Sequence, residues 1–320
     1  MSPQRVVLIG GAGFIGSAIA NRLAEAGISV LIPTRRRSRA GQVLLLPNVE
    51  VIETDCHDES VLNELFEDAD AVVNLVGILH SRSGSPYGPD FARAHVELPT
   101  RIVAACKASG VGQLIHVSAL GADAAAPSEY QRSKAAGEQA VRAATPEVAW
   151  TILRPSVVFG RDDGFLNLFA RLAGVLPIIP LGGASARFQP VYVEDVAEVV
   201  WHCLNDSAAA RDQTFELAGP TVYTLRQLVE YVSALVGHPR PVIPLPEGLA
   251  MLQAGLMELA PRPLMSRDNV RSMRADNIAT AAPLPFGLRP TAIEAVVPGW
   301  LGPAGNQRAR YNPMRRHARR

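Results

Sequence analysis

The stretch that decides the fold is "GGAGFIG", residues 10–16, near the start of the chain. It places Gly10, Gly13 and Gly16 at a G-x-x-G-x-x-G spacing, directly after the apolar run "RVVLI" and directly before a segment of helical periodicity. Glycines in this context let the backbone approach a pyrophosphate that sits on free helix N–H groups. The stretch therefore predicts a nucleotide-binding turn, and a glycine-rich turn that binds nothing is the alternative.

Short apolar runs recur along the first half of the chain, and helical segments separate several of them. Near-continuous apolarity indicates strands buried on both faces, and strand–helix alternation indicates a parallel sheet with right-handed crossovers. The clearest crossover helix runs from Phe14 to Gly27, so Phe14 and Ile15 place their N–H groups at the turn. We predict an α/β fold with a doubly wound parallel sheet of Rossmann type. The runs are "RVVLIG", "ISVLIP", "VEVIET", "DAVVNLVG", "QLIHVS" and "AWTILRPSVV".

The chain of 320 residues is long enough for two lobes. The strand–helix alternation loosens after residue 160, where Pro and Gly become frequent. We expect a dinucleotide-binding domain at 1–160, rejoined by 191–218, and a smaller C-terminal substrate or partner lobe at 161–190 and 219–301. The arm 302–320 is polar and basic, and we expect it to be disordered.

Composition excludes several classes of protein. A hydrophobic content of 48%, a charged content of 19% and a net charge of +1 give no overall field that would recruit nucleic acid. Three cysteines, Cys56, Cys106 and Cys203, are too few for a disulfide framework or a zinc site, so we expect no metal. The sequence shows neither a signal-peptide pattern nor roughly 18 consecutive apolar residues. A cytoplasmic location fits these features.

The choice of dinucleotide depends on the residues after the second apolar run. An acid there would bind the ribose 2′-hydroxyl of NAD(H), whereas Arg suits the 2′-phosphate of NADP(H). The sequence has "LIPTRRRSR", residues 31–39, and no carboxylate before Glu50. We therefore favour NADP(H), bound by Arg35 and Arg36. NAD(H), with a solvated basic loop, remains the alternative.

Two further strand ends are expected at the same edge of the sheet. "ETDCHD" places Asp55 and Cys56 where an adenine could contact them, although Asp55 could instead cap a helix together with Asp58. "NLVG" places Val76 and Gly77 at the end of the fourth strand, where a glycine would keep the backbone close to the cofactor.

The segment "YQRSK", residues 130–134, places a phenol and an ammonium four residues apart. On a helix, Tyr130 and Lys134 share one side and could act on the same small molecule. The alternative is a solvated polar face of the helix.

The order of these segments resembles the short-chain dehydrogenase/reductase superfamily, in its extended, epimerase/dehydratase-like branch. The ordered motifs are "GGAGFIG", "TDCHD", "HVSALG", "YQRSK", "RPSVVFGR" and "FQPVYVEDVAEVV". A narrower resemblance, carried by "YQRSKAAGEQAV", "LRPSVVFGRDDGFLNLFARL" and "MSRDNVRSMRADNIA", is to bacterial relatives of the nucleotide-binding accessory subunit of respiratory complex I.

The resemblance implies a role for each matched residue. Tyr130 would be the catalytic acid/base, and Lys134 would lower the phenol pKa and bind the nicotinamide ribose. Pro155 would border the nicotinamide. The family's third catalytic hydroxyl is expected directly after Ser118, where this chain has Ala119, so Ser118 is the remaining candidate. A shift of one residue along a strand can turn a side chain to the other face.

The resemblance leaves more than one function open. The chain is either an NADP(H)-binding oxidoreductase or a nucleotide-stabilised accessory factor of complex I or ubiquinone metabolism. The alternative is a nucleotide-sugar epimerase/dehydratase or a carbonyl reductase that uses Tyr130 and Lys134. The partners implied are a small molecule or quinone, and a respiratory complex at the inner face of the membrane.

Several other features have two interpretations each. His80 and the loop "SRSGSPYG", residues 81–88, suggest a flexible flap over a cleft, although His80 is more simply a loop residue. Arg161 with Asp162, and Arg187, could bind a polar substrate group or form local ion pairs. The apolar stretch 244–265 could contact a quinone or a membrane, but we favour a core helix of the smaller lobe.

Overall fold

The computed structural model describes residues 3–260 and 263–302. The chain divides into two compact units. The first comprises the chain up to Pro155 with Val193–Leu217 and Ala279–Leu288, and the second comprises Ser156–Tyr192, Ala218–Ile278 and the chain from Arg289 onward. We expected residues 279–288 in the smaller lobe, because no sequence feature indicates that they belong to the first unit. Of the arm 302–320, all but Gly302 lies outside the described residues.

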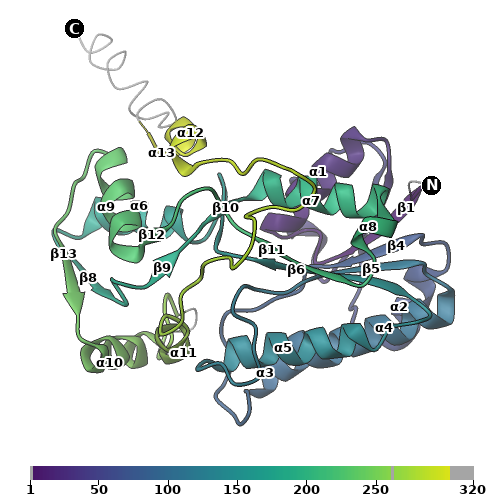
Figure 1. Ribbon diagram of the computed structural model, residues 1–320, viewed down its shortest axis with the longest axis horizontal. Coiled ribbons are helices and arrows are strands. Elements are labelled where there is room, and N and C mark those ends of the chain that lie inside the picture. The colour runs from purple at the N-terminus through teal and green to yellow at the C-terminus, as the bar shows by residue number, and fades with distance from the viewer. Residues whose placement is uncertain (1–2, 261–262, 303–320) are drawn as a thin grey trace, which may run out of the picture. The chain divides into compact units, whose positions relative to one another are not determined.

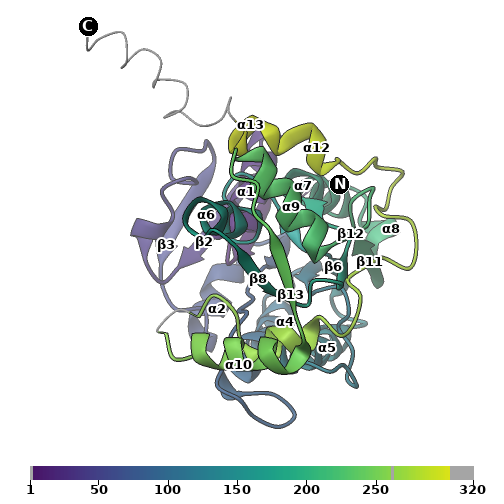
Figure 2. The same cartoon turned by 90° about the vertical axis from the view of Figure 1, so that its left-hand side faces the viewer.

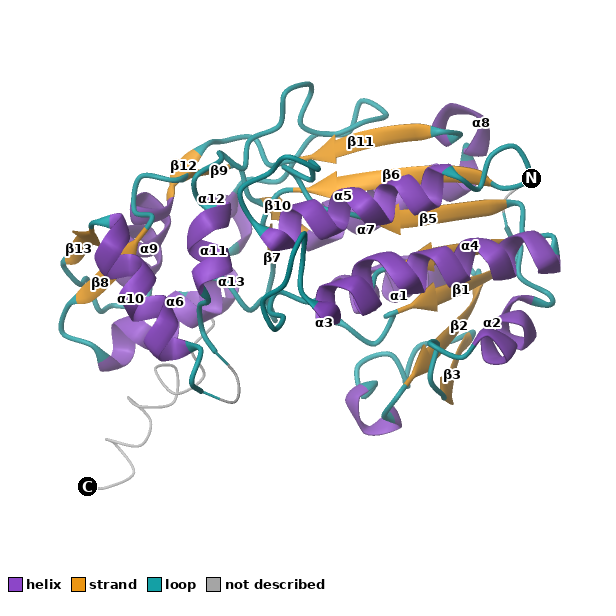
Figure 3. Ribbon diagram, turned by 90° about the horizontal axis from the view of Figure 1, so that it is seen from below, coloured by secondary structure: helices purple, strands orange, loops and turns teal. Residues whose placement is uncertain are grey.

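The first unit is built on a seven-stranded sheet in the order β11-β6-β5-β4-β1-β2-β3. Every neighbouring pair is parallel, so the carboxyl ends of the strands, drawn as arrowheads in Figure 3, all lie at the same end of the sheet. The predicted doubly wound α/β fold is therefore confirmed. Its strands are β1 (Arg5–Ile9), β2 (Ser29–Thr34), β3 (Val49–Glu53), β4 (Ala71–Asn74), β5 (Gln113–Val117), β6 (Ala149–Pro155) and β11 (Gln213–Leu217).

Helices cover both faces of this sheet. Helices α1 and α7 pack together on one face, and α2, α4 and α5 lie on the other (Figure 1). They are α1 (Phe14–Glu25), α2 (Glu59–Phe66), α3 (Pro89–Phe91), α4 (Leu98–Ser109), α5 (Glu129–Arg142), α7 (Val193–Asn205) and α8 (Ser207–Ala210), with a 3-10 turn at Arg37–Arg39 and a π-helical turn at Ala92–Glu97.

The sheet forms the hydrophobic core of the first unit, because its strands are apolar on both faces. In β1, the side chains from Val6 to Ile9 are at most 1% exposed. Apolar side chains from α2 and α4, including Phe66 and Ile102, pack against this core. The core holds the carboxyl ends of the parallel strands rigidly at one edge, which is where the site residues lie.

The second unit contains short strand pairs and helices. Strands β8 and β13 run side by side, with α10 next to them (Figure 2). Its elements are β7 (Val158–Phe159), α6 (Leu166–Val175), β8 (Ile179–Gly182), β9 (Arg187–Phe188), β10 (Val191–Tyr192), β12 (Tyr223–Thr224), α9 (Leu225–Leu235), β13 (Val242–Leu245), α10 (Glu247–Met257), α11 (Arg267–Ser272), α12 (Ile293–Val296) and α13 (Pro298–Leu301). Its core gathers around Phe159, Phe169 and Val229.

The prediction of a core helix in the stretch 244–265 is wrong. Helix α10 lies at the surface of its unit, and only Ala250 and Ala254 are fully buried within it. Leu249, Leu252 and Leu256 are 53%, 61% and 63% exposed. The helix is apolar on most sides, and such a pattern does not distinguish a helix with neighbours on every side from one with neighbours on a single side.

Among the described helices, none combines the length and the apolarity that a bilayer-spanning segment requires.

Candidate nucleotide site

The glycine turn starts where β1 ends. Gly10 has a φ of +87°, in the left-handed region that glycine adopts without strain. A Cβ atom on Gly16 would lie 2.5 Å from the Cα of Gly11. Helix α1 can pack this closely on the turn only because residue 16 has no side chain. The protein's own packing thus requires glycine at both ends of the motif.

The N-terminus of α1 has no side-chain cap. Its N-cap residue is Gly13, which has no side chain to accept the N–H groups of Phe14, Ile15 and Gly16. Free N–H groups at the positive end of a helix dipole bind phosphate groups. The pyrophosphate of a dinucleotide therefore fits this turn, and a larger side chain at residue 13 would fill the approach to it.

The arginines after β2 differ in their contacts. Arg37 is fixed against β3, because its Nη1 donates to the Val51 carbonyl oxygen at 2.6 Å and its backbone N–H donates to Glu53. Arg35 and Arg36 have exposed side chains, which form no hydrogen bond or ion pair within the described part of the chain. Two guanidinium groups are thus available at the position where a 2′-phosphate is bound in this fold.

The turn after β3 gives Asp55 and Asp58 different roles. Asp58 is the N-cap of α2 and accepts the Ser60 N–H at 3.0 Å. Asp55 accepts the His57 N–H within the turn at 3.1 Å, so the capping alternative applies to Asp58 and not to Asp55. Burial, reinforced by the charge of Asp55, raises the pKa of Cys56 to about 12. The Cys56 thiol therefore stays protonated and is not a nucleophile.

The loop after β4 meets the glycine turn directly. A Cβ atom on Gly10 would lie 3.3 Å from the backbone nitrogen of Val76. The Val76 N–H donates to Asn74 Oδ1 at 3.1 Å. Gly77 is exposed and has no close neighbour that would exclude a side chain, the nearest atom being His95 Nε2 at 3.9 Å from a built Cβ. Two strand ends named from the sequence, those of β1 and β4, are thus brought together.

Tyr130 lies in the first turn of α5, where Ser128 caps the helix. Its ring packs edge-on against His95, with centroids 5.6 Å apart, and against Phe91 at 6.0 Å. Burial raises the pKa of Tyr130 to about 12. The lowering of the phenol pKa that we expected from Lys134 is not found, because the loss of solvent dominates.

Lys134 is 2% exposed, and its Nζ donates to the Val117 carbonyl oxygen at 2.8 Å, at the end of β5. Burial lowers the pKa of Lys134 to about 8, opposed by the negative charge of Glu138. The ammonium therefore lies inside the unit, and the solvated polar face that was the alternative for "YQRSK" does not describe it.

The Ser118 hydroxyl points to an interior ion pair. Its Oγ donates to Glu138 Oε1 at 2.6 Å, and the residue is 4% exposed. Glu138 in turn accepts two hydrogen bonds from Arg154, at 2.8 and 2.7 Å. This geometry argues against the catalytic role that we assigned to Ser118, because the hydroxyl already has a charged acceptor. Ser118 stands one residue before the position at which the resemblance places this hydroxyl, and successive residues of an extended segment face opposite sides.

Glu138 and Arg154 were not selected from the sequence. Glu138 does continue the stripe of Tyr130 and Lys134 at a spacing of four residues, which was a usable signal. Its carboxylate is 3% exposed and also lies 3.3 Å from Arg142 Nη2. Pro155, the residue after Arg154, ends β6, and its carbonyl oxygen accepts the Leu120 N–H at 3.0 Å.

Two buried histidines near the site were also missed. His95 is 1% exposed and lies in the π-helical turn Ala92–Glu97. His116 is 1% exposed, and its Nδ1 lies 3.1 Å from the amide nitrogen of Asn74. Burial lowers the pKa of both rings, to about 2 for His95, so both are neutral.

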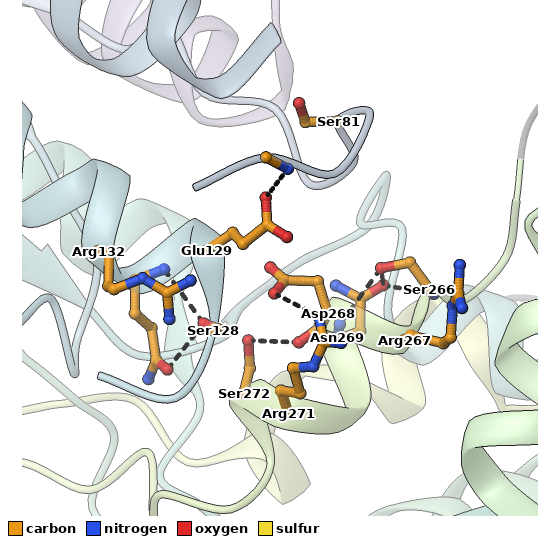
Figure 4. A network of polar contacts seen from close by, with 12 residues as sticks. Ser81, Ser128, Glu129, Arg132, Ser266, Arg267, Asp268, Asn269, Arg271 and Ser272 are labelled. Atoms are coloured by element: carbon orange, nitrogen blue, oxygen red, sulfur yellow. Dashed lines mark hydrogen bonds and ion pairs between the residues drawn. The ribbon is translucent and has the colours of Figure 1, made fainter. Parts of the chain in front are cut away.

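The loop 81–88, expected to be a flexible flap, is held at several points. The Gly84 N–H donates to Glu129 at 3.0 Å, and Arg132 donates to the Pro86 carbonyl oxygen at 2.9 Å. Arg82 forms an ion pair with Asp90. Figure 4 shows the Glu129 side chain on α5 reaching this loop.

The substrate candidates in the second unit have local partners. Arg187 donates from Nη2 and Nε to Asp276 Oδ2, at 2.6 and 3.1 Å, and this carboxylate compensates its charge. At the start of α6 the capping acid is Asp163, which accepts the N–H groups of Phe165 and Leu166, and not Asp162. Helix α11 begins with a capping box of Ser266 and Asn269, also drawn in Figure 4.

A model of the NAD dependent epimerase/dehydratase family matches residues 6–218. The mitochondrial NADH dehydrogenase [ubiquinone] 1 alpha subcomplex subunit 9 of Arabidopsis thaliana is 32% identical over 295 residues, which cover 87% of this chain and 72% of that protein. A ceramide reductase of Caulobacter vibrioides is 32% identical over 196 residues, covering 60% and 58%. The family model and the relative from Arabidopsis thaliana agree with the resemblances that the motifs carry.

Solved structures show the same fold. The UDP-glucuronic acid 4-epimerase of Bacillus cereus, in complex with UDP-glucuronic acid and NAD, matches with a TM-score of 0.65 over 84% of this chain and 99% of that chain. The two sequences are 18% identical, so the likeness concerns the fold alone.

Proposed function

The chain belongs to the NAD dependent epimerase/dehydratase family, and from that premise we propose that it holds NADP(H) as a structural nucleotide and serves as an accessory protein of a respiratory-chain complex. The glycine turn and the start of α1 would hold the pyrophosphate, and Arg35 with Arg36 would hold the 2′-phosphate. Lys134 would bind the nicotinamide ribose. The remaining residues that we propose to line the site are Asp55, Cys56, Val76, Gly77 and Pro155.

The observation that carries this proposal is the engagement of Ser118 by Glu138. NADP(H) when bound supplies a hydride, but exchange with a substrate also needs protein groups that move a proton. Here the Ser118 hydroxyl donates to a buried ion pair, residue 119 is alanine, and the pKa of Tyr130 is raised to about 12. This arrangement favours a protein that binds the nucleotide without using it in a reaction. A tightly held ligand stabilises the native state by mass action.

Association with a respiratory complex is supported by the relatives and by α10. The relative from Arabidopsis thaliana is, by its name, a subunit of the NADH dehydrogenase. The exposed leucines of α10 form an uncharged stripe, because no charged residue lies between Glu247 and Glu258. These two acids pair with Arg274 and Arg267. Uncharged apolar surface is typical of the centre of a protein–protein interface. We propose that this stripe contacts a subunit of the complex, at the inner face of the membrane.

A second candidate is an oxidoreductase or an epimerase/dehydratase that acts through Tyr130 and Lys134 on a small molecule or quinone. The placement of Tyr130 favours it, since the ring is fixed between Phe91 and His95 at the start of α5. A reductase among the relatives supports the same candidate.

One experiment tests the nucleotide. The full chain is purified without added cofactor, and the released nucleotide is identified by mass. We expect NADP(H), and a thermal shift with NADPH that exceeds the shift with NADH. A tighter fit for NADH would show that the choice of cofactor is wrong, and no shift with either would refute the nucleotide site.

A second experiment separates the two candidates. Tyr130→Phe should leave nucleotide content and thermal stability unchanged if the nucleotide is structural. Loss of NADPH-dependent reduction of a quinone or carbonyl substrate in this variant would favour the enzyme instead.

Association is tested in membranes of the native host. The tagged full chain should co-migrate with the NADH:ubiquinone oxidoreductase activity on a native gel. Replacement of Leu252 and Leu256 by Ser should abolish this, while the control Leu45→Ser, at a residue 89% exposed in the first unit, should not. Co-migration that survives the α10 changes would exclude the stripe.

A further inference from the structure

In the loop after β4, the backbone N–H groups of two alternate residues, Val76 and Ile78, donate to buried side chains. The Val76 N–H donates to Asn74 Oδ1 at 3.1 Å, and the Ile78 N–H donates to His95 Nε2 at 3.0 Å. Gly77, between them, is exposed. The course of the loop is thus set by two buried side chains.

His95 also contacts α5. Its Nδ1 lies 2.8 Å from Ser133 Oγ, and its ring packs edge-on against Tyr130. One buried imidazole therefore joins the loop at the end of β4 to the helix that carries Tyr130 and Lys134.

The hydrogen bonds assign the tautomer of His95. Ser133 Oγ donates its proton to the Tyr130 carbonyl oxygen at 2.7 Å, so towards His95 it is an acceptor. Nδ1 must then carry the proton, and Nε2 accepts from Ile78. A neutral ring with this tautomer satisfies both of its polar atoms.

The backbone around His95 is adapted to this position. The π-helical turn Ala92–Glu97 is wider than an α-helix, and such turns occur often at functional sites. A Cβ atom on Gly137 would lie 2.1 Å from the His95 carbonyl oxygen. The turn can approach α5 this closely only because residue 137 is glycine.

We propose that His95 is a positioning residue, which fixes the loop Val76–Ile78 relative to Tyr130 and Lys134 and so sets the affinity of the nucleotide site. The inference rests on the proposed nucleotide binding. His95 acts through the backbone of Ile78 and through Ser133.

Three variants of the full chain test it. His95→Gln places an acceptor oxygen near the position of Nε2, and His95→Asn places a donor near the position of Nδ1. His95→Ala removes both. We expect His95→Ala and His95→Asn to weaken NADPH binding by about tenfold, and His95→Gln to stay within about threefold, as the loss or retention of one hydrogen bond would give.

A merely structural role would give a different pattern. The unfolding of the nucleotide-free variants is measured alongside the affinities. Affinities that follow stability, or an asparagine variant that binds as well as the glutamine variant, would overturn the inference. Unchanged affinity in His95→Ala would do the same. A wild-type chain that binds no dinucleotide would overturn the proposed function as well.

The tautomer gives a measurement that needs no nucleotide. The nitrogen chemical shifts of the His95 ring should show a protonated Nδ1 and an unprotonated Nε2 between pH 5 and pH 8. A proton on Nε2 would remove the acceptor for Ile78, and with it the positioning role.

Discussion

The ion pair beneath Ser118 gives a prediction about stability. In Glu138→Gln, the side chain keeps its shape but loses its charge, so Arg154 loses its ionic partner. We expect a clear loss of stability in the nucleotide-free chain. The reason is that the Glu138 and Arg154 side chains are only 3% and 26% exposed, so water replaces the lost interaction poorly.

The size of the effect follows from these exposures. Breaking a fully buried ion pair by removing one partner costs about 3–5 kcal/mol. Arg154 keeps some access to water, and the glutamine oxygen can still accept from the Ser118 hydroxyl. Both reduce the cost, and we expect a decrease of about 2–3 kcal/mol in the free energy of unfolding.

Urea unfolding followed by circular dichroism measures this change, as a lower midpoint at an unchanged slope. The matched control is Glu147→Gln, because Glu147 pairs with Lys107 at 3.1 Å but is 54% exposed. The control should cost much less than Glu138→Gln, because water screens an exposed ion pair. In Glu138→Gln with Arg154→Met, the second change should add little to the first. A cost for Glu138→Gln no larger than that of the control would refute the buried pair.

Three further predictions follow from the site. Burial lowers the Lys134 pKa from 10.5 to about 8, so between these pH values the unfolded chain binds a proton that the folded chain does not, and stability rises with pH. In urea titrations, the free energy of unfolding of the wild type minus that of Lys134→Met should rise above pH 8 by up to about 1.4 kcal/mol per pH unit. A difference that does not change with pH would contradict the buried ammonium. Arg35→Ala or Arg36→Ala should weaken NADPH binding about tenfold in calorimetry and leave NADH binding unchanged, whereas the control Arg37→Ala should affect neither. Ser118→Ala should lower stability by about 1–2 kcal/mol without changing NADPH affinity, and a large loss of affinity would return Ser118 to the site.

The sheet could be predicted from the sequence because its signals are local. Buried parallel strands are apolar along their whole length, and the helix after residue 13 has a clear apolar face. The π-helical turn at 92–97 has no such signal, and its close approach to α5 depends on Gly137 in another helix. The exposure of α10 was also out of reach, because composition gives the apolar residues of a helix but not the number of its neighbours.

In the candidate site, too, features with a local sequence signal could be predicted, and contacts between distant residues could not. Glycine spacing indicated the turn, since the requirement is local: Gly10 has a positive φ, and a Cβ atom on Gly16 would meet Gly11 within the motif itself. The partner of Ser118 could not be identified, because Glu138 is twenty positions away and Arg154 lies on a third element. His95 sits in "RAHVE", a segment with no feature that distinguishes it from an ordinary helix.

The raised pKa of the Tyr130 phenol decides whether this side chain can transfer a proton in a reaction. A phenol with a pKa of about 12 is ionised in roughly one molecule in 100,000 at pH 7. Lowering that pKa to about 8 would take roughly 5.5 kcal/mol, at about 1.4 kcal/mol for each unit. One hydrogen bond to a charged group supplies about 1.5–3 kcal/mol, and the Lys134 ammonium already donates to the Val117 carbonyl oxygen. Proton transfer by Tyr130 would thus need a second stabilising group, and the hydroxyl of our sequence-based candidate, Ser118, donates to Glu138. A pH–rate profile is the appropriate test: activity with an apparent pKa near 7 that disappears in Tyr130→Phe would show that nucleotide binding rearranges these contacts.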